Sequence, residues 1–353
     1  MKLYFKGLDT LRAIAAIVVV ISHIELIKSN FNIPALLNIN LPDAHLAVIL
    51  FFILSGFLIT FLLVKEKEDT DTISFRKFYT RRILRIWPVY YLVIFSSLII
   101  FDAQYSIKTI ALCLGIFPNI AHALNIGWTT SPQIWSIGVE EQFYLFWPLI
   151  IYIIPSKKLI TYLLVFTIAY TLLPHCIKYI NDLSYKNESL NDFANRFFYL
   201  SKFNSMSIGG IFGCLFALKR KALSFFYKRI IAYPAIVLSF LLWFSGFSTS
   251  NFNDIMYSLL FAIMILNVST NKNLKFSLES KVFNFLGKIS YGMYMYHWII
   301  LLLIIKILPF SFFNSNSTYN IALYSIGLST TILISYVSFI SFEKYFLRIK
   351  EKY

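Results

Sequence analysis

Apolar stretches of membrane-spanning length recur along the whole chain and leave it few folds. A helix needs about 20 mostly apolar residues to cross a bilayer, and such stretches alternate here with short polar segments. They cover residues 10–28, 46–64, 86–102, 136–154, 159–177, 203–218, 230–247, 253–270, 286–308 and 320–343. The period-two alternation typical of outer-membrane strands is not seen in the sequence. We therefore predict an all-α fold, a polytopic membrane bundle of about ten transmembrane helices.

The composition agrees with a membrane protein and excludes a soluble enzyme. Of the 353 residues, 58% are hydrophobic and only 14% are charged, whereas soluble domains are about half apolar and about a quarter charged. Lys and Arg number 32 against 17 Asp and Glu. Because they lie mostly between the apolar stretches, we expect membrane lipids as the anionic partner and no nucleic acid. Cys113, Cys176 and Cys214 have neither disulfide nor zinc-site spacing, and we predict no metal site.

The distribution of basic residues predicts how the chain is oriented. With both termini in the cytoplasm, most of the 32 Lys and Arg residues fall in inner segments, as the positive-inside rule requires. Residues 107–120 are apolar but short, and counting them as an eleventh span would remove this bias. We therefore interpret them as a re-entrant or interfacial segment of a multi-pass protein of the inner (plasma) membrane.

Arg12 and His23 place two ionisable side chains in the first predicted span. At about 100° and 1.5 Å per residue, they lie within about 20° of one helix face and about 16 Å apart along the axis. Charged groups inside a span are costly and usually functional. A snorkelling arginine and a packed histidine would explain each residue alone, but the pair on one face of an apolar helix favours a functional site.

Basic residues gather just before the third span. Lys77, Arg81 and Arg85 recur every four residues and form one stripe on a helix, with Arg82 beside it. The stripe could anchor the helix to anionic lipid head groups. Arginine also recognises phosphate through two parallel hydrogen bonds, so a clamp for a nucleotide-bearing substrate is the alternative. The sequence leaves both interpretations open.

Acidic residues lie near the start of the fourth predicted span. A helix with a purely structural role would not need them there. Glu140, Glu141 and Gln142 enter this span together. Adjacent side chains on a helix point about 100° apart, so only one of the two carboxylates can face a given partner. We interpret this segment as part of a site, in which Glu140 or Glu141 orients His23.

The remaining histidines carry weaker signals. His297 lies in the ninth span among Tyr and Met residues, where a hydrogen-bonded core histidine is commoner than a catalyst. His45, His122 and His175 lie near predicted outer ends of spans or in outer loops, without a charged neighbour in helical register. We expect these three side chains to be solvated or structural.

Five segments together resemble the integral-membrane acyltransferase family 3, which includes bacterial O-antigen, exopolysaccharide and antibiotic O-acyltransferases. The resemblance runs from residue 5 to about residue 345, with the blocks in the family's order. The blocks are GLDTLRA at residues 7–13 with Arg12-x10-His23, FFILSGF at 51–57, RRILRIWP at 81–88, EEQFY at 140–144, and ISYG at 289–292 leading to His297. Many relatives carry an acidic or amide residue where this chain has Ile49, so we assign no polar role to that face of the second span.

The resemblance implies an O-acetyltransferase, a transferase of acyl groups other than aminoacyl groups. Its members move an acyl group, commonly acetyl from acetyl-CoA, to a hydroxyl of a glycan such as the O-antigen of lipopolysaccharide, or of a lipid-linked sugar. Acyl-CoA would then be the donor substrate, with no permanently bound cofactor. Carried over to this chain, the catalytic residues are His23, Arg12, Glu140 and Glu141, and the residues that bind the donor are Arg81, Arg82 and Arg85.

Domain organisation and one rival function complete the expectations. We expect residues 1–353 to form a single membrane acyltransferase domain without a fused extracytoplasmic domain. A transporter or flippase for a lipid-linked sugar or polysaccharide would also suit many helices with intramembrane charge. The inverted repeat that many transporters show is not found in the sequence, and a scaffold without chemistry would not explain the clustered Arg, His and Glu.

Overall fold

The computed structural model describes residues 4–34, 41–184, 186–249 and 252–352. Within these ranges the chain is helical and contains no strand, as the sequence predicts. Each predicted span coincides with a helix. These helices are α1 (Leu8–Asn30), α2 (Ala44–Thr70), α3 (Phe75–Phe101), α6 (Trp135–Ile153), α7 (Leu159–Ser184), α9 (Phe203–Ala217), α11 (Arg229–Phe244), α12 (Asn253–Thr270), α13 (Lys281–Ile307) and α14 (Asn316–Ser338).

Among the described residues, seven helices are long and apolar enough to cross a membrane, which makes this a multi-pass membrane protein. They are α1, α2, α3, α7, α12, α13 and the rod formed by α14 and its continuation to Lys350. The other three predicted spans fall short for local reasons. Helix α6 has 19 residues but carries Glu140 and Glu141. Helices α9 and α11 have 15 and 16 residues, whereas a span needs about 20.

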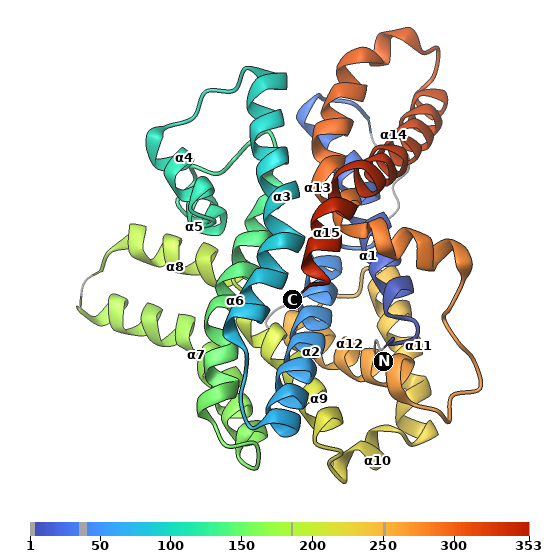
Figure 1. Ribbon diagram of the computed structural model, residues 1–353. Coiled ribbons are helices and arrows are strands. Elements are labelled where there is room, and N and C mark those ends of the chain that lie inside the picture. The colour runs from blue at the N-terminus through green and yellow to red at the C-terminus, as the bar shows by residue number, and fades with distance from the viewer. Residues whose placement is uncertain (1–3, 35–40, 185, 250–251, 353) are drawn as a thin grey trace.

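The segment expected to be re-entrant or interfacial is a helical hairpin of two short helices, α4 (Ile107–Leu114) and α5 (Pro118–Ala123). Ser106 caps α4 by accepting a hydrogen bond from the backbone N–H of Thr109 at 3.1 Å. Between the helices, Ile116 has a φ of 65°, a conformation that a β-branched residue rarely adopts. The hairpin lies beside the upper part of α3 in Figure 1 and does not form a span.

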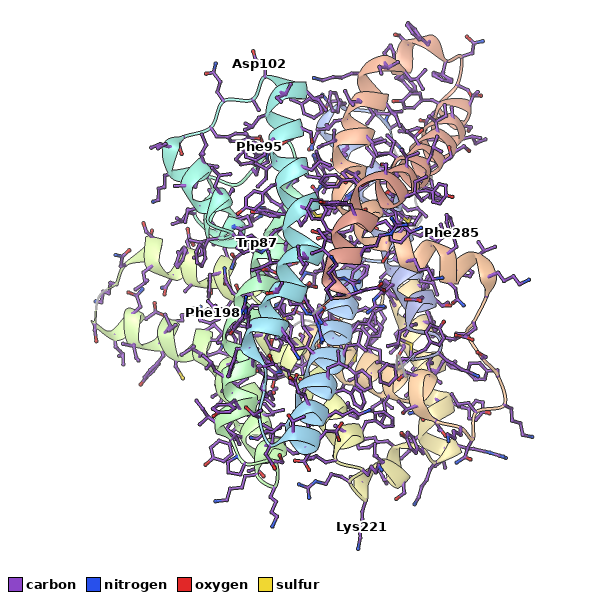
Figure 2. All side chains as sticks on the ribbon, viewed as in Figure 1. Trp87, Phe95, Asp102, Phe198, Lys221 and Phe285 are labelled. Atoms are coloured by element: carbon purple, nitrogen blue, oxygen red, sulfur yellow. The ribbon has the colours of Figure 1, made fainter. Side chains whose placement is uncertain are left out.

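The remaining helices are short and mostly peripheral: α8 (Glu188–Leu200), α10 (Ala222–Phe226) and α15 (Lys344–Lys350). Helix α10 lies at the lower end of the bundle in Figure 1, near which Lys221 points away from the protein in Figure 2, whereas Asp102 marks the opposite end. A π turn, η3 (Phe339–Glu343), joins α14 to α15 and brings α15 beside α3 at the centre of the molecule.

Helix α2 packs against α9 with the two backbones nearly in contact. A Cβ atom on Gly209 would overlap the carbonyl oxygen of Ile53, and a Cβ on Gly56 would overlap that of Met206. Small residues permit such close approach where van der Waals packing, rather than the hydrophobic effect, holds helices together in lipid. This contact fixes α2 in the middle of the bundle, where most of its residues are buried.

Helix α1 is held between α13 and α14. Near its start, a Cβ on Gly287 of α13 would overlap the backbone of Asp9. Near its end, the fully buried Lys28 donates a hydrogen bond to Glu25 at 2.6 Å and another to Asn320 of α14. Tyr324 of α14 also donates to Glu25, at 2.6 Å. Both ends of α1 are therefore fixed, and with them the positions of the ionisable residues between.

The α2–α9 contact predicts that Gly209→Ala destabilises the protein, because overpacking a close contact typically costs about 1–3 kcal/mol. We expect a lower melting temperature in detergent, measured by intrinsic fluorescence. Gly115→Ala is the matched control, since a Cβ there would meet its own turn and the Phe117 ring rather than another helix. Equal melting temperatures for Gly209→Ala and the unmodified protein would contradict the backbone contact.

Candidate active site

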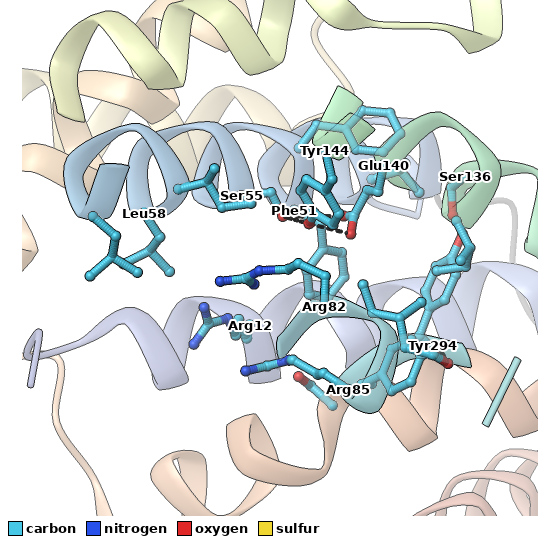
Figure 3. Close-up of a pocket in the computed structure, with 18 of the residues that line it drawn as sticks. Arg12, Phe51, Ser55, Leu58, Arg82, Arg85, Ser136, Glu140, Tyr144 and Tyr294 are labelled. Carbon is cyan, nitrogen blue, oxygen red and sulfur yellow. Dashed lines mark hydrogen bonds between the residues drawn. The ribbon is translucent and has the colours of Figure 1, made fainter. Parts of the chain in front are cut away.

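A cavity of about 270 Å³ lies among α1, α2, α3, α6, α13 and α15. Apolar side chains of α2 form one wall, and polar groups converge from the other helices (Figure 3). The polar and charged residues that line it are Arg12, Ser55, Arg82, Arg85, Ser136, Glu140, Tyr144, Ser290, Tyr291, Tyr294 and Lys350. The cavity thus collects residues from nearly every segment that the sequence singles out.

Three guanidinium groups face this cavity from two helices. Figure 3 shows Arg12 of α1 with Arg82 and Arg85 of α3 directed into one space. Arg12 forms an ion pair with Asp9 at 3.1 Å and keeps 21% of its side chain exposed. Arg82 lies over the Tyr144 ring at 5.6 Å, and its buried Nε atom has no hydrogen-bond partner among the described residues. An excess of positive charge with unused donors suits an anionic ligand.

The basic stripe expected on α3 divides into two parts. Lys77 and Arg81 lie on the exposed side of the helix. Arg82 and Arg85, one turn apart, line the cavity. The structure therefore brings Arg82 and Arg85 together with Arg12 and leaves Arg81 outside this group. Lys350, which the sequence does not single out, joins the cavity from α15.

Glu140 forms a compact hydrogen-bonded group with α2 and with its own helix. Ser55 donates to its Oε1 at 3.3 Å, and Tyr144, one turn along α6, donates to its Oε2 at 2.8 Å. The dashed lines in Figure 3 mark these bonds on the side of the cavity opposite Arg12. A carboxylate held by two hydroxyls and facing guanidinium groups is compensated inside an apolar bundle.

Glu141 and Gln142 point to other partners, as the turn of the helix requires. Trp87 of α3 donates its indole N–H to Glu141 at 2.8 Å, and Gln142 donates its amide N–H to Asn119 at 2.7 Å. The expected contact of a carboxylate with His23 is therefore wrong in this structure. Both glutamates bind donors on α2, α3 and α6 instead.

His23 pairs with His297 of α13. The distance from Nδ1 of His23 to Nε2 of His297 is 2.7 Å, and the ring centroids are 5.0 Å apart with 16° between the planes. A nitrogen–nitrogen contact this short is incompatible with face-to-face stacking, so the rings meet edge to edge in nearly one plane. Nδ1 of His297 also lies 2.7 Å from the backbone carbonyl oxygen of Tyr294, which lines the cavity.

The two imidazoles differ in accessibility. His297 is fully buried, at 0% exposure. His23 is only half-buried, and its ring makes a T-shaped contact with the Trp298 ring, with 5.1 Å between the centroids. Of the two rings, only that of His23 is therefore accessible to a second molecule. His297 contacts His23 from the buried side.

A second cavity, of about 400 Å³, lies at the N-terminal end of α2, and His45 is one of the residues that line it. His45 has a charged partner: its Nε2 lies 3.2 Å from Asp254 of α12. Lys202 also binds Asp254, at 2.6 Å. Helical register within one stretch could not show a pair formed between two distant helices. Ser22, next to His23, donates to the carbonyl of Pro42 at 2.8 Å and so ties α1 to this end of α2.

Several site residues escaped the sequence analysis for identifiable reasons. Tyr144 lies one turn after Glu140, a spacing that can be recognised on any helix. Ser55 lies in the FFILSGF block but carries no charge. Nothing in the sequence distinguishes Tyr294 or Lys350, which reach the cavity through tertiary packing.

Comparison with known proteins finds relatives of this chain. A peptidoglycan O-acetyltransferase of Listeria monocytogenes is 31% identical over 160 residues, 41% of this chain and 24% of that protein. A "putative peptidoglycan O-acetyltransferase" of Bacillus subtilis is 31% identical over 173 residues, 44% of this chain. These matches span only about a quarter of the relatives' own length, and no solved structure matches. A family model described as an acyltransferase domain matches residues 5–340, nearly the whole sequence, and the chain therefore belongs to this acyltransferase family.

Proposed function

We propose that this protein transfers an acyl group, most simply acetyl, from acyl-CoA to a hydroxyl of a cell-surface glycan or its lipid-linked precursor. One observation carries the proposal: a cavity that gathers Arg12, Arg82 and Arg85 also includes Tyr294, whose carbonyl binds the histidine pair. The relatives are named as peptidoglycan O-acetyltransferases, which supports a glycan hydroxyl as the acceptor.

The donor's phosphates fit the arginine cavity. Arg82 and Arg85 on one helix and Arg12 on another supply planar groups that bind phosphate through paired N–H bonds. Lys350 adds a further positive charge. Arg81, outside the cavity, would act on the donor only at the exposed surface of α3. About 16 Å of helix separates Arg12 from His23, a distance that the extended pantetheine arm of CoA would bridge.

His23 is the proposed general base. It removes the proton of the acceptor hydroxyl while that oxygen attacks the thioester carbonyl carbon. The new C–O bond forms, the C–S bond breaks, and His23 returns the proton to the leaving CoA thiolate. Glu140 supports the reaction indirectly by binding Ser55 and Tyr144 on the cavity wall. A variant of this scheme makes His23 a transient acyl carrier, with the acyl group on its ring before the hydroxyl attacks.

The acceptor is proposed to approach from the end of the bundle where the second cavity lies. Hydroxyl, amide and aromatic side chains line that cavity, including Thr171, Asn204 and Tyr199. Such groups suit a polar sugar, and the Ser22–Pro42 hydrogen bond ties this end of α2 to the helix that carries His23. Donor and acceptor would then reach His23 from opposite sides.

The topology that goes with this chemistry has ten spans, with both termini in the cytoplasm of a bacterial cell and the protein in the inner membrane. Helices α6, α9 and α11 are counted as spans because, with ten spans, most Lys and Arg residues fall on the cytoplasmic side, as the positive-inside rule requires. The shortness of α9 and α11 and the two glutamates of α6 are compatible with crossing inside a bundle, where neighbouring helices rather than lipid surround them.

Replacing the base tests the function directly. Purified wild-type protein in lipid nanodiscs should transfer labelled acetyl from acetyl-CoA to muropeptides, detected by mass spectrometry. His23→Ala should lower kcat by about 10²–10⁴-fold, the usual contribution of a positioned base, in a protein that still folds and unfolds cooperatively. Wild-type turnover in a folded His23→Ala protein would remove His23 from the chemistry. Labelled acetyl retained on the wild-type protein without acceptor would favour the acyl-carrier variant.

The arginine cavity predicts a defect specific to the donor. Arg82→Lys keeps the charge but loses the planar pair of donors, and we expect the KM for acetyl-CoA to rise about tenfold, equivalent to about 1.4 kcal/mol. The KM for the acceptor should stay the same. Arg76→Lys makes the same exchange on the exposed side of the same helix and is the matched control. An equal rise in both variants would indicate that any guanidinium on this helix matters to the same degree, and would reject the phosphate clamp.

Single cysteines distinguish ten spans from seven. In a background without native cysteines, Lys158→Cys and Lys275→Cys lie on the cytoplasmic side if α6, α9 and α11 cross, and on the outer side if only the seven long helices do. Gln104→Cys marks the outer side in both cases. We expect a membrane-impermeant maleimide on intact spheroplasts to label Gln104→Cys alone. Labelling of Lys158→Cys or Lys275→Cys would reject the ten-span topology.

A further inference from the structure

The His23–His297 contact fixes where the protons lie. A carbonyl oxygen can only accept, so the 2.7 Å contact with Tyr294 requires a proton on Nδ1 of His297. A neutral imidazole carries one N–H and one acceptor nitrogen. Nε2 of neutral His297 must therefore accept from Nδ1–H of His23 across the 2.7 Å between them. In this arrangement Nε2 of His23 carries no proton.

We propose that His297 is a positioning residue that holds His23 in the Nδ1–H tautomer, so that its Nε2 is free to accept the acceptor's proton. This inference rests on the proposed function, in which His23 is the base. It gives His297 a role that a merely hydrogen-bonded core histidine would lack. The logic is that of a catalytic triad, where the residue behind the base sets its tautomer and orientation, here with an imidazole in place of a carboxylate.

Burial separates the roles of the two residues. His297 has 0% exposure, and both of its ring nitrogens are hydrogen-bonded within the protein, so it cannot contact the acceptor. The neighbouring residues on α13 hold it in place. Gln133 donates to the carbonyl of Met295 at 2.8 Å, and the hydroxyls of Tyr294 and Ser136 lie 2.7 Å apart. The helix therefore cannot rotate His297 away without breaking bonds to the segment that begins α6.

The His23–His297 pair can also hold the proton that the acceptor hydroxyl loses in the proposed reaction. When Nε2 of His23 takes the hydroxyl proton, the ring becomes an imidazolium with protons on both nitrogens. Its Nδ1–H remains bonded to Nε2 of neutral His297, which keeps its own Nδ1 proton on the Tyr294 carbonyl. No further proton has to move, and the one positive charge is shared through a short hydrogen bond until His23 protonates the CoA thiolate.

Two substitutions of His297 separate tautomer control from simple filling of space. In His297→Gln the amide oxygen reaches the position of Nε2 and can still accept from His23. In His297→Asn the shorter amide reaches the position of Nδ1, keeps the bond to the Tyr294 carbonyl, and leaves His23 without a partner. We expect His297→Asn to lower kcat about 10²–10⁴-fold, as loss of an orienting residue does, with unchanged KM for acetyl-CoA. His297→Gln should restore most of that kcat.

The kinetic outcomes decide between the roles. Equal losses in the two variants at matched melting temperatures would mean that His297 only supports the fold. Wild-type kcat in His297→Asn would mean that His23 needs no partner. Either result overturns the proposal, and a large kcat loss in His297→Asn that His297→Gln reverses supports it.

A spectroscopic measurement tests the tautomer without any activity. In protein labelled with ¹⁵N-histidine, comparison with His23→Ala assigns the His23 signals. We expect a protonated Nδ1 and an unprotonated Nε2 in the wild type, and loss of this preference in His297→Asn. A protonated Nε2 on neutral wild-type His23 would overturn the inference. If no acetyl transfer were found, the proposed function would fail. The spectrum would still show whether His297 sets the tautomer of His23.

Discussion

An ion that leaves water for the interior of a helical bundle loses several kcal/mol of solvation even after the protein relaxes, and this cost shapes the centre of the molecule. Three charged side chains show how the structure meets this cost. Glu140 is bound by two hydroxyls, Arg82 lies against the aromatic faces of Phe78 and Tyr144, and Lys28 is paired with Glu25. The helices that supply these partners must stay in register with one another.

The glycine contact between α2 and α9 supplies that register on one side of the cavity. Gly56 faces α9, where its missing side chain lets the backbone of Met206 approach. Ser55, about 100° around the same helix, is thereby turned toward the cavity and donates to Glu140. The packing that holds α2 in the bundle and the polar group that lines the cavity thus depend on two adjacent residues.

Much of the architecture follows from the sequence because apolar length determines where helices can form in a membrane. Every predicted span coincides with a helix, and residues 107–120 form a short hairpin. The number of crossings is less determined, because α6, α9 and α11 are too short or too polar for length and composition to decide. Arg12 and His23 both lie on α1, because the apolar stretch that contains them forms one continuous helix.

Contacts between distant helices could not be predicted in this way. His23 and His297 lie 274 positions apart, and their meeting depends on how α1 packs against α13. The same holds for His45 with Asp254. On α3, an every-fourth-residue pattern grouped Arg81 with Arg85, whereas the facing helices select Arg82 and Arg85. Periodicity identifies a charged helix face, but the neighbouring helices decide which part of that face lines a cavity.

The π turn η3 at Phe339–Glu343 has a consequence for the C-terminal segment. A π turn accommodates one residue more than the regular α-helical ladder, so everything after it is rotated by about 100° relative to an uninterrupted α-helix. That phase shift is what aims Lys350 at the arginine cavity. A deletion of one residue within η3 would remove this offset and turn the Lys350 ammonium group away from Arg12, Arg82 and Arg85.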